Sequence, residues 1–494
     1  MGFIKKLGSD TAIYGLSSIL GRFLNYLLVP LYTAKISAES GGYGVITNVY
    51  GYVALLMVIL TYGMETTLFR YINKEDEDPE KVYTTVLTSV GTTALLFVVA
   101  VLSLLWWIAP AMGYPDHPEY IGIMAVVVGL DAFQAIPFSY LRAKKRPIKF
   151  AALKLTFIVL NISLNLLYFI ALPALYKSHP DIVGVIYDPS VGVGYVFVLN
   201  LVCTGLVTLG VWKELFGVKW QPQWALLKRM LGYSWPLLVL GIAGILNQTA
   251  DKILFPYIYT KPDAQMQLGI YGASVKIAMI MALITQAFRY AYEPIIFDKS
   301  VKEDKQLMQA IGMKFFVIFT LAAFMAVMAG IDVLKYIIGR DYWDGLVTVP
   351  IVMTAEIMMG IYFNLSFWYK LTDRTIWGAV LSGIGCTVMI ALNFIFVPSY
   401  GYMACAWAGV AGYGTAMVLS YIMGQHYAPV RYPIKDIAVY VALTIALYAA
   451  GAAVDFGNEW VMTAYRSVLF LIFMAVVVVR EGIFARIAHR LKRG

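Results

Sequence analysis

The chain has 494 residues, of which 60% are hydrophobic and 14% charged, and its mean hydropathy is +0.73. Soluble domains carry about 25% charged residues, and a soluble surface closed around this much apolar material would expose large apolar patches. The composition therefore excludes an ordinary soluble globule and indicates a membrane protein. The formal charge of +9 does not call for a nucleic-acid partner, because the cytoplasmic loops of membrane proteins are rich in Lys and Arg.

Apolar runs of about 20 residues, the length that crosses a bilayer as a helix, recur along the whole chain. The N-terminal stretch MGFIKKLGSD has no small-residue cleavage site after it and is interpreted as the cytoplasmic start of the protein. The pattern predicts an all-α polytopic membrane protein with about 14 transmembrane helices. The expected spans are 11–34, 44–69, 82–108, 119–141, 149–174, 191–212, 229–257, 267–293, 307–332, 344–370, 375–397, 402–424, 436–454 and 461–480.

The basic residues outside these spans are shared unevenly between the two sides of the membrane. With the N-terminus inside, 26 Lys and Arg fall in cytoplasmic segments and five in the opposite loops. The positive-inside rule therefore predicts that both termini are cytoplasmic. With the end residues of each span counted in the loops, seven more basic residues lie inside spans, and they are Arg22, Lys154, Lys252, Lys276, Arg289, Lys314 and Arg466.

The two halves of the chain contain similar segments. RPIKFAALKLTFIVLNISLN starts at Arg146 and RTIWGAVLSGIGCTVMIALN at Arg374, and in both an Asn follows the Arg nineteen residues later. The segments LLVPLYT and ILFPYIY are likewise each followed by a Tyr-Gly pair. Internal repeats of this kind build a binding site between two lobes in many secondary transporters. We expect two six-helix lobes, 1–218 and 219–430, and an appended helix pair with a basic tail over 431–494.

Basic groups inside the spans are candidates for function, because a charge at mid-bilayer costs about 2.5 to 3.5 kcal/mol. Arg22 lies near the middle of its span with Asn25 on the same helical face. We expect it either to line a cavity or to pair with an acidic residue. Lys154, Lys314 and Arg466 lie near the ends of their spans, where long side chains can reach the headgroups by snorkelling.

The span 229–257 carries a polar stripe. Asn247 and Asp251 are four residues apart, as are Gln248 and Lys252, so these pairs share a helical side. Asp251 and Lys252 are adjacent and could neutralise each other. The stripe therefore predicts a polar cavity lining in which the two charges are at least partly balanced.

The next span, 267–293, adds Lys276 and Arg289. Arg289 precedes Glu293 by four residues, the spacing of a helical ion pair. Two interpretations remain open, a cationic cavity lining or a simple ion pair at headgroup level. Because basic groups match or outnumber acids within the spans, the cavity would favour an anionic substrate such as a phosphate or pyrophosphate.

Four acidic residues within the spans are candidates for ion coupling, and they are Glu65, Asp131, Asp251 and Glu356. An intramembrane carboxylate is by default a proton or sodium site, because loss of water favours its neutral form. The alternative is a counter-ion for a buried base. The sequence has no GxxxxGK[ST] loop, and its three Cys and four His show no ligand spacing, so no cofactor or metal is expected beyond a coupling H⁺ or Na⁺.

Several segments resemble the polysaccharide-transporter family of the multidrug/oligosaccharidyl-lipid/polysaccharide (MOP) exporter superfamily. They are GGYGVITNVYGYVALLMVILTYGMETTLFRYI at 41–72, the RAKKRP loop at 142–147, ADKILFPYIYTKPDAQMQLGIYGASVKIAMIM at 250–281 and NFIFVPSYGYMACAWAGVAGYG at 393–414. The resemblance implies a bacterial inner-membrane flippase of the Wzx, or O-antigen flippase, kind. Such proteins move undecaprenyl-pyrophosphate-linked oligosaccharides to the periplasmic leaflet through two lobes in a V-shaped arrangement.

The resemblance also implies roles for single residues. Arg22 matches a basic cavity position of the related lipid II flippases, whereas Lys252, Lys276 and Arg289 match the family by location only. A glycan polymerase or assembly machinery is the protein partner implied. An enzyme is not expected, because the longest outer loop, about 175–190, holds few charged groups. The two alternatives within the superfamily are a cation-coupled multidrug (MATE-like) exporter and a lipid II flippase.

Overall fold

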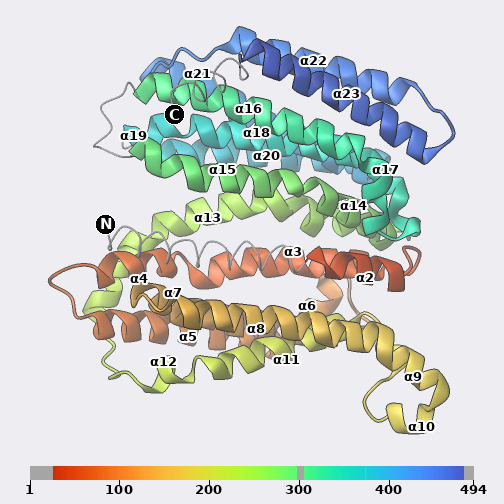
Figure 1. The fold of residues 1–494 in the computed structure, drawn as a ribbon. Coiled ribbons are helices and arrows are strands. Elements are labelled where there is room, and N and C mark those ends of the chain that lie inside the picture. The colour runs from red at the N-terminus through yellow and green to blue at the C-terminus, as the bar shows by residue number, and fades with distance from the viewer. Residues whose placement is uncertain (1–25, 298–304, 373, 483–494) are drawn as a thin grey trace. The chain divides into compact units, whose positions relative to one another are not determined.

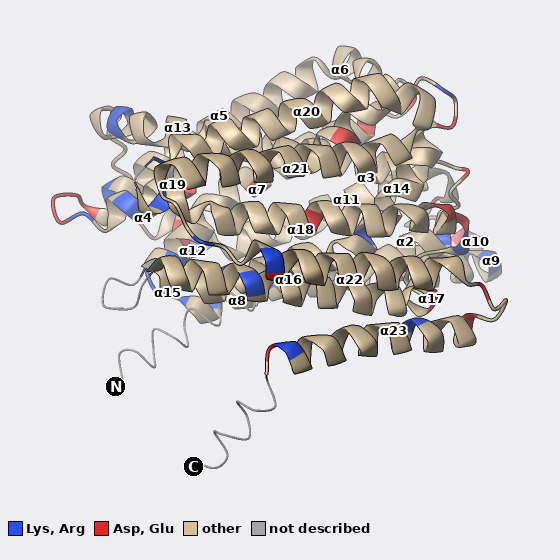
Figure 2. Ribbon diagram, turned by 90° about the horizontal axis from the view of Figure 1, so that it is seen from above, with Lys and Arg blue, Asp and Glu red and all other residues tan. Residues whose placement is uncertain are grey.

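The computed structural model describes residues 26–297, 305–372 and 374–482, and every regular element in these ranges is a helix (Figure 1). Twelve of the described helical segments are long and apolar enough to cross a membrane. Most of their length carries neither Lys, Arg, Asp nor Glu (Figure 2). The prediction of an all-helical, multi-pass membrane protein is therefore confirmed.

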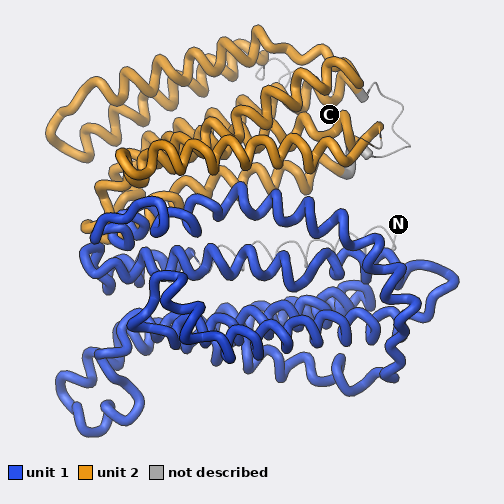
Figure 3. Tube along the Cα trace, turned by 180° about the vertical axis from the view of Figure 1, so that it is seen from behind, with its two compact units in different colours: residues 1–272 blue, residues 273–494 orange. Residues whose placement is uncertain are grey.

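The chain divides into two compact units, residues 1–272 and residues 273–494, with the boundary inside α14 (Figure 3). Unit 1 contains α2 (Leu28–Lys35), α3 (Gly42–Thr61), α4 (Met64–Ile72), α5 (Pro79–Ser103), α6 (Leu105–Ala111), α7 (Pro118–Ala143), α8 (Pro147–Leu166), the π-helix η1 (Leu167–Ala171), α9 (Leu172–Ser178), α10 (Pro180–Val183), η2 (Pro189–Val191), α11 (Gly194–Gly210), α12 (Trp212–Phe216), α13 (Trp224–Ile258) and the start of α14 (Ala264–Ala278). Unit 2 contains the end of α14, then α15 (Ile280–Phe297), α16 (Lys305–Ala329), α17 (Ile331–Leu334), η3 (Lys335–Ile337), η4 (Arg340–Thr348), α18 (Val349–Leu365), α19 (Phe367–Leu371), α20 (Ile376–Tyr400), α21 (Tyr402–Tyr427), α22 (Ile434–Ala453) and α23 (Glu459–Arg480). This division reflects how the helices pack and does not test the lobe boundaries expected at 218 and 430. Those boundaries stay a prediction.

The observed spans follow the predicted ones closely. They are Gly42–Ile72, Pro79–Ser103, Pro118–Ala143, Pro147–Ser178, Trp224–Ile258, Ala264–Glu293, Gln306–Ala329, Arg340–Leu371, Ile376–Tyr400, Tyr402–Tyr427, Ile434–Ala453 and Glu459–Arg480. The predicted span 191–212 corresponds to α11, a shorter apolar helix of 17 residues. The predicted first span, 11–34, lies largely outside the described residues. The count of fourteen therefore stays a prediction.

Proline sets the start of three long helices of unit 1. Pro79, Pro118 and Pro147 open α5, α7 and α8, where the missing N–H would have no partner in any case and the fixed φ suits a helix. Asp78 caps α5, because the Glu80 N–H donates a hydrogen bond to its Oδ1 at 2.9 Å. These local signals begin the helices within a few residues of the predicted boundaries.

The span 42–72 is broken between α3 and α4. Tyr62 and Gly63 have φ values of 32° and 74°, in the left-handed region. A Cβ on Gly63 would lie 2.9 Å from the Cβ of Leu237, so glycine is required there for space as well as for backbone conformation. The break redirects α4, which packs against α5, α7 and α13 and brings the acidic side chain of Glu65 beside α7.

The two units have separate cores. In unit 1, a buried cluster lies among α4, α5, α7 and α13, where the rings of Tyr83 and Tyr140 stack with centroids 3.9 Å apart. In unit 2, α20 and α21 pack through Gly385 and Gly412. A Cβ on Gly385 would lie 2.7 Å from the Gly412 carbonyl oxygen, and a Cβ on Gly412 would lie 2.8 Å from the Gly385 carbonyl oxygen. Small residues at this contact let the two backbones approach closely, as is common between helices in membranes.

Candidate functional site

Two predicted cavity residues, Arg22 and Asn25, lie outside the described residues. The predicted polar stripe lies on α13. There, the Asn247 amide donates a hydrogen bond to the Ala243 carbonyl of its own helix at 2.9 Å. The Gln248 side chain is exposed on the same helix. The structure thus confirms that the stripe is helical, while its role as a cavity lining stays a prediction.

The two charges of this stripe pair with each other. The Lys252 Nζ lies 3.0 Å from the Asp251 Oδ1, and the Tyr271 hydroxyl of α14 donates to the Asp251 Oδ2 at 2.9 Å. The Asp251 residue is 7% exposed. A buried carboxylate with a charged partner and a hydroxyl donor is a satisfied counter-ion. Of the two interpretations left open by the sequence, these contacts favour the counter-ion over a free coupling site.

A proline in α13 creates a polar site that the sequence analysis did not identify. Pro256 has no N–H, so it leaves the carbonyl of Lys252 without its helical hydrogen bond. The Asn48 amide of α3 donates to that carbonyl oxygen at 2.8 Å. The Tyr114 hydroxyl in turn donates to the Asn48 Oδ1 at 2.8 Å. The interrupted helix is therefore stabilised by side chains from distant segments of unit 1.

The two mid-span carboxylates, Asp131 and Glu356, lie in different units. Asp131 on α7 accepts a hydrogen bond from the Thr204 hydroxyl of α11 at 3.3 Å and is attracted by Lys154 on α8. The Lys154 Nζ lies 4.2 Å from the centre of the Phe138 ring, a distance at which a cation is attracted by the ring face. Glu356 is half-buried on α18. Ion coupling through either residue stays a prediction.

Glu65, the fourth predicted acid, has a basic partner. The Arg142 Nη2 of α7 lies 3.1 Å from the Glu65 Oε2, and the Ser139 hydroxyl donates to the same oxygen at 3.2 Å. The two charged side chains are 36% and 40% exposed. Such a half-exposed pair contributes little to stability, and these contacts place Glu65 among the ion-paired residues.

Unit 2 concentrates basic groups on and beside α15. The Lys370 Nζ lies 2.9 Å from the Glu293 Oε1, whereas the Arg289 Nη2 lies 3.7 Å from that oxygen. The Arg289 guanidinium also lies over the Phe363 ring, 4.4 Å from its centre. Lys276, also predicted for the cavity, is half-buried on α14. Because one carboxylate faces two cations, the Arg289–Glu293–Lys370 group has a net positive charge. The ion pair predicted between Arg289 and Glu293 is present, but at 3.7 Å it is long.

The α22–α23 hairpin is joined to the rest of unit 2 by ion pairs near both of its ends. Lys314 of α16 lies 2.7 Å from Glu481 and 3.4 Å from Asp436, and near the opposite end Arg466 lies 2.7 Å from Asp332. Burial raises the pKa of Glu481, but hydrogen bonds, above all from Lys314, hold it below the ordinary value of 4.5. The interpretation of Lys314 and Arg466 as snorkelling side chains missed these partners.

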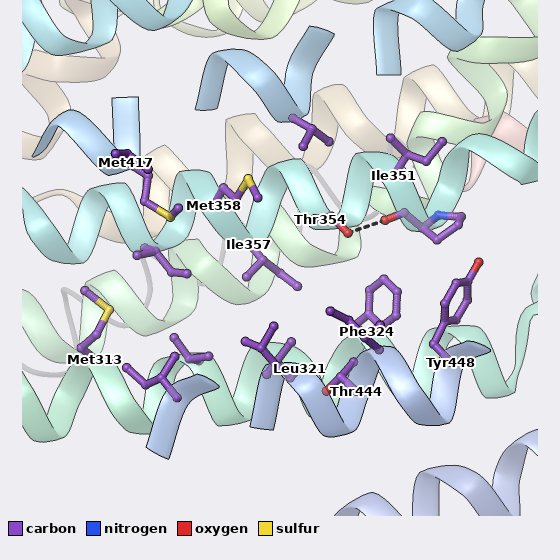
Figure 4. Close-up of a pocket in the computed structure, with 18 of the residues that line it drawn as sticks. Met313, Leu321, Phe324, Ile351, Thr354, Ile357, Met358, Met417, Thr444 and Tyr448 are labelled. Carbon is purple, nitrogen blue, oxygen red and sulfur yellow. Dashed lines mark hydrogen bonds between the residues drawn. The ribbon is translucent and has the colours of Figure 1, made fainter. Parts of the chain in front are cut away.

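Unit 2 also contains an apolar groove of about 890 Å³ between α16, α18, α21 and α22 (Figure 4). Its lining extends from Met313 at one end to Tyr448 at the other. The Thr354 hydroxyl in the lining donates to a carbonyl of its own helix at 2.8 Å. Trp407 and Ile445, which also line the groove, are 58% and 61% exposed, so it opens on the surface. Such a groove suits a hydrocarbon chain rather than a polar ligand.

The arrangement of the helices defines the class of fold. The fold is similar to that of the lipid II flippase MurJ in an inward closed conformation, with a TM-score of 0.72 and 14% identity over 95% of this chain and 99% of that chain. It is also similar to the inward-facing structure of a multidrug resistance MATE family transporter of the MOP superfamily, with a TM-score of 0.63 and 14% identity over 84% and 97% of the two chains. The chain therefore has the fold of MOP-superfamily transporters.

The family follows from the sequence itself. The chain belongs to the polysaccharide biosynthesis protein family, whose sequence model matches residues 7–298. It is also similar to the Lsg locus protein 1 of Haemophilus influenzae, with 20% identity over 427 residues that cover 85% of this chain and 98% of that protein. The resemblance to polysaccharide transporters of the MOP superfamily is therefore confirmed.

Proposed function

We propose that the protein is a flippase for an undecaprenyl-pyrophosphate-linked oligosaccharide. It moves this substrate from the cytoplasmic to the periplasmic leaflet of the bacterial inner membrane by alternating access. The substrate then serves the synthesis of a surface polysaccharide, such as O-antigen, capsule or exopolysaccharide, by a glycan polymerase or assembly machinery. Both termini are cytoplasmic in this proposal. The family and the MOP-type fold support a transporter, and the apolar groove of unit 2 is the observation that favours a lipid-linked substrate.

The pyrophosphate headgroup needs positive charge that is not already neutralised. Lys252 is paired with Asp251 at 3.0 Å, so its charge is largely balanced before any substrate binds. The Arg289–Glu293–Lys370 group keeps a net positive charge, and Arg289 is 38% exposed. We assign Arg289 the leading role among the described residues, since a guanidinium can donate two parallel hydrogen bonds to a phosphate. Arg22 remains the second basic residue proposed for this role.

The polyprenyl tail needs an apolar path beside the polar one. The groove between α16, α18, α21 and α22 has the required chemistry along its whole lining. A polyprenyl chain there would exchange lipid contacts for equally apolar protein contacts, whereas a sugar would lose hydrogen bonds. This assigns the appended helix α22 a place in substrate binding. A drug exporter that takes compact cations would have less use for such a groove.

Net export needs an energy source or removal of the product. We propose a proton or sodium gradient, which supplies about 2.3 kcal/mol for each charge moved through 100 mV. Asp131, Glu356, Asp251 and Glu65 are the candidate coupling residues, and the last two have basic partners at 3.0 and 3.1 Å. Flipping in liposomes with and without an imposed H⁺ or Na⁺ gradient tests this step. Equal flipping under all gradients would reject ion coupling.

The groove can be tested with two tryptophan variants that differ only in position. Ile445→Trp adds an indole to the groove lining, and Val468→Trp adds one to an exposed position of α23 outside it. The host is the native organism with its own copy deleted, and both variants must reach the membrane in equal amounts. We expect Ile445→Trp to reduce surface glycan and Val468→Trp to restore it fully. Equal restoration by both would reject the groove as the tail site.

A further inference from the structure

A segment of unit 1 projects away from the rest of that unit. Residues 167–193, here called the foot, comprise η1, α9, α10, η2 and the turns between them. Figures 1 and 3 both show α9 and α10 extending beyond the neighbouring helices of unit 1. The main helix contacts of α9 are with η1 and α10. The α9–α10 part of the foot therefore has little protein around it, whereas η1 packs against α2 and α8.

The outer surface of the foot is apolar. Ile182, Val185 and Ile186 are 75%, 83% and 58% exposed. Monomeric proteins do not normally place three large aliphatic side chains in contact with water within five residues of an outer turn. Something apolar must therefore cover them.

The apolar surface is continuous with the side of α8 that faces lipid. Large apolar side chains are exposed on this helix at Ile148, Val159 and Leu166, and the series goes on through Ile170 and Leu175 into the foot. The spacings of eleven, seven and four residues keep Ile148, Val159, Leu166 and Ile170 on one side of the helix, and Leu175 follows in the foot. Since α8 lies in a multi-pass membrane protein, lipid covers the first part of this surface. The same medium is the simplest cover for its continuation.

The length of the helix indicates how deep the foot lies. The segment Pro147–Ser178 has 32 residues, which corresponds to about 48 Å of helix at 1.5 Å per residue. The hydrocarbon core of a bilayer is only about 30 Å thick. The end of this helix thus passes beyond the core, so the part of the foot that follows it, residues 179–193, lies at headgroup level.

The inner surface of the foot has the composition of a membrane interface. Tyr168, Tyr187 and Tyr176 form a chain of ring contacts through Tyr195, with centroid distances of 4.9 Å for Tyr168–Tyr195, 5.5 Å for Tyr187–Tyr195 and 5.8 Å for Tyr176–Tyr187. All four rings are half-buried. Tyrosine is enriched at headgroup level, because its ring prefers an apolar contact and its hydroxyl a polar one.

The charges of the foot also fit a lipid surface. Its fully charged residues are Lys177, Asp181 and Asp188, all exposed. No cluster of one sign is present that would attract an oppositely charged protein or a polyanion. The Ser190 N–H donates to the Asp188 Oδ1 at 2.9 Å, and this hydrogen bond lowers the Asp188 pKa. These exposed charged groups would face the aqueous side of the headgroup layer.

We propose that the foot lies in the headgroup layer of one leaflet and inserts Ile182, Val185 and Ile186 among the upper acyl chains. The partner is the lipid surface itself. The tyrosine cluster forms the rigid centre of the foot, and the charged residues face water. This inference needs only a multi-pass membrane protein and is independent of the proposed flippase activity.

Fluorescence quenching tests the proposal directly. Val185→Cys is labelled with an environment-sensitive dye in the full-length chain, whose three native cysteines are buried, and the protein is placed in lipid nanodiscs. Glu75→Cys, at an exposed charged position of the 73–78 turn, serves as the water-exposed control. We expect loss of the Val185 signal with a nitroxide on the upper acyl chain and no loss with aqueous iodide. The dye at position 75 should be quenched by iodide and not by the nitroxide on the acyl chain.

Two other results would overturn the proposal. Quenching of Val185 by iodide to the same extent as Glu75 would mean that the foot stands in water. Protection from both quenchers would mean that a protein, such as a second copy of the chain, covers it. As a further check, Val185→Asp should abolish nitroxide quenching of a dye at Ile186→Cys, while Asp181→Asn should leave it unchanged. Undiminished nitroxide quenching in Val185→Asp would also refute insertion.

Discussion

Lys314 is expected to hold the α22–α23 hairpin on α16, and Lys314→Met should destabilise unit 2. The Lys314 Nζ lies 2.7 Å from Glu481, whose side chain is 6% exposed, and 3.4 Å from Asp436. Met keeps the apolar stem but removes the ammonium partner of the Glu481 carboxylate, to which the Tyr440 hydroxyl also donates, at 2.7 Å. Breaking a buried pair costs about 3 to 5 kcal/mol. Because Lys314 is itself 18% exposed, we expect the lower end, about 3 kcal/mol.

Thermal unfolding of the purified chain in detergent measures this loss. A cost of about 3 kcal/mol corresponds to a decrease in Tm of about 6 to 12 °C for a unit of this size. The double variant Lys314→Met/Glu481→Gln should recover most of the loss, because it leaves no uncompensated carboxylate. Arg480→Ala is the matched control, since its 2.8 Å pair with Asp436 is more than a third exposed on both sides and should be worth less than about 1 kcal/mol. A double variant as unstable as the single one would refute this reasoning.

Three further predictions concern stability. Asn48→Ala should destabilise unit 1 by about 1 to 3 kcal/mol, because the Lys252 carbonyl loses its donor; a melting temperature equal to that of the wild type would contradict this. Gly385→Ala should destabilise unit 2 by about 1 to 3 kcal/mol, because its Cβ would lie 2.7 Å from the Gly412 carbonyl oxygen, and chemical denaturation measures the loss. The pKa of Glu481 is below 4.5 in the folded chain, so its contribution to stability is present above that pH and is lost as the pH falls through the folded pKa. Measuring Tm against pH tests this direction. The Tm should decrease as the pH drops below 4.5 in the wild type, and it should decrease less steeply in Glu481→Gln.

Contacts between neighbours in sequence were predictable. The spans follow from the length of apolar runs, which the bilayer thickness fixes. Asp251 and Lys252 are adjacent, and Arg289 and Glu293 are four apart, so the rules of helix geometry place each pair together. The structure confirms both proximities, at 3.0 and 3.7 Å. What helix geometry alone could not supply was the third partner, such as Tyr271 for Asp251.

Contacts between distant helices could not be predicted from one sequence. Lys314 lies in α16 and Glu481 directly follows α23, and no periodic pattern relates them. The groove of unit 2 depends on how four helices pack, while each of them has an ordinary apolar sequence. The contact of Asn48 with the Lys252 carbonyl differs from these, because the sequence provides a reason to expect such a donor. Pro256 within a span frees a carbonyl that must find a donor, so a polar residue elsewhere in the bundle was required.

The proposed function is tested most directly in the native organism. Its own gene is deleted, and surface glycan and drug susceptibility are measured with the wild-type chain, with Arg22→Ala and with Arg289→Ala, all at equal membrane levels. We predict that deletion abolishes the surface glycan, that the wild type restores it and that both variants fail to do so. Unchanged surface glycan after deletion, together with increased drug susceptibility, would contradict the flippase proposal and favour a multidrug exporter.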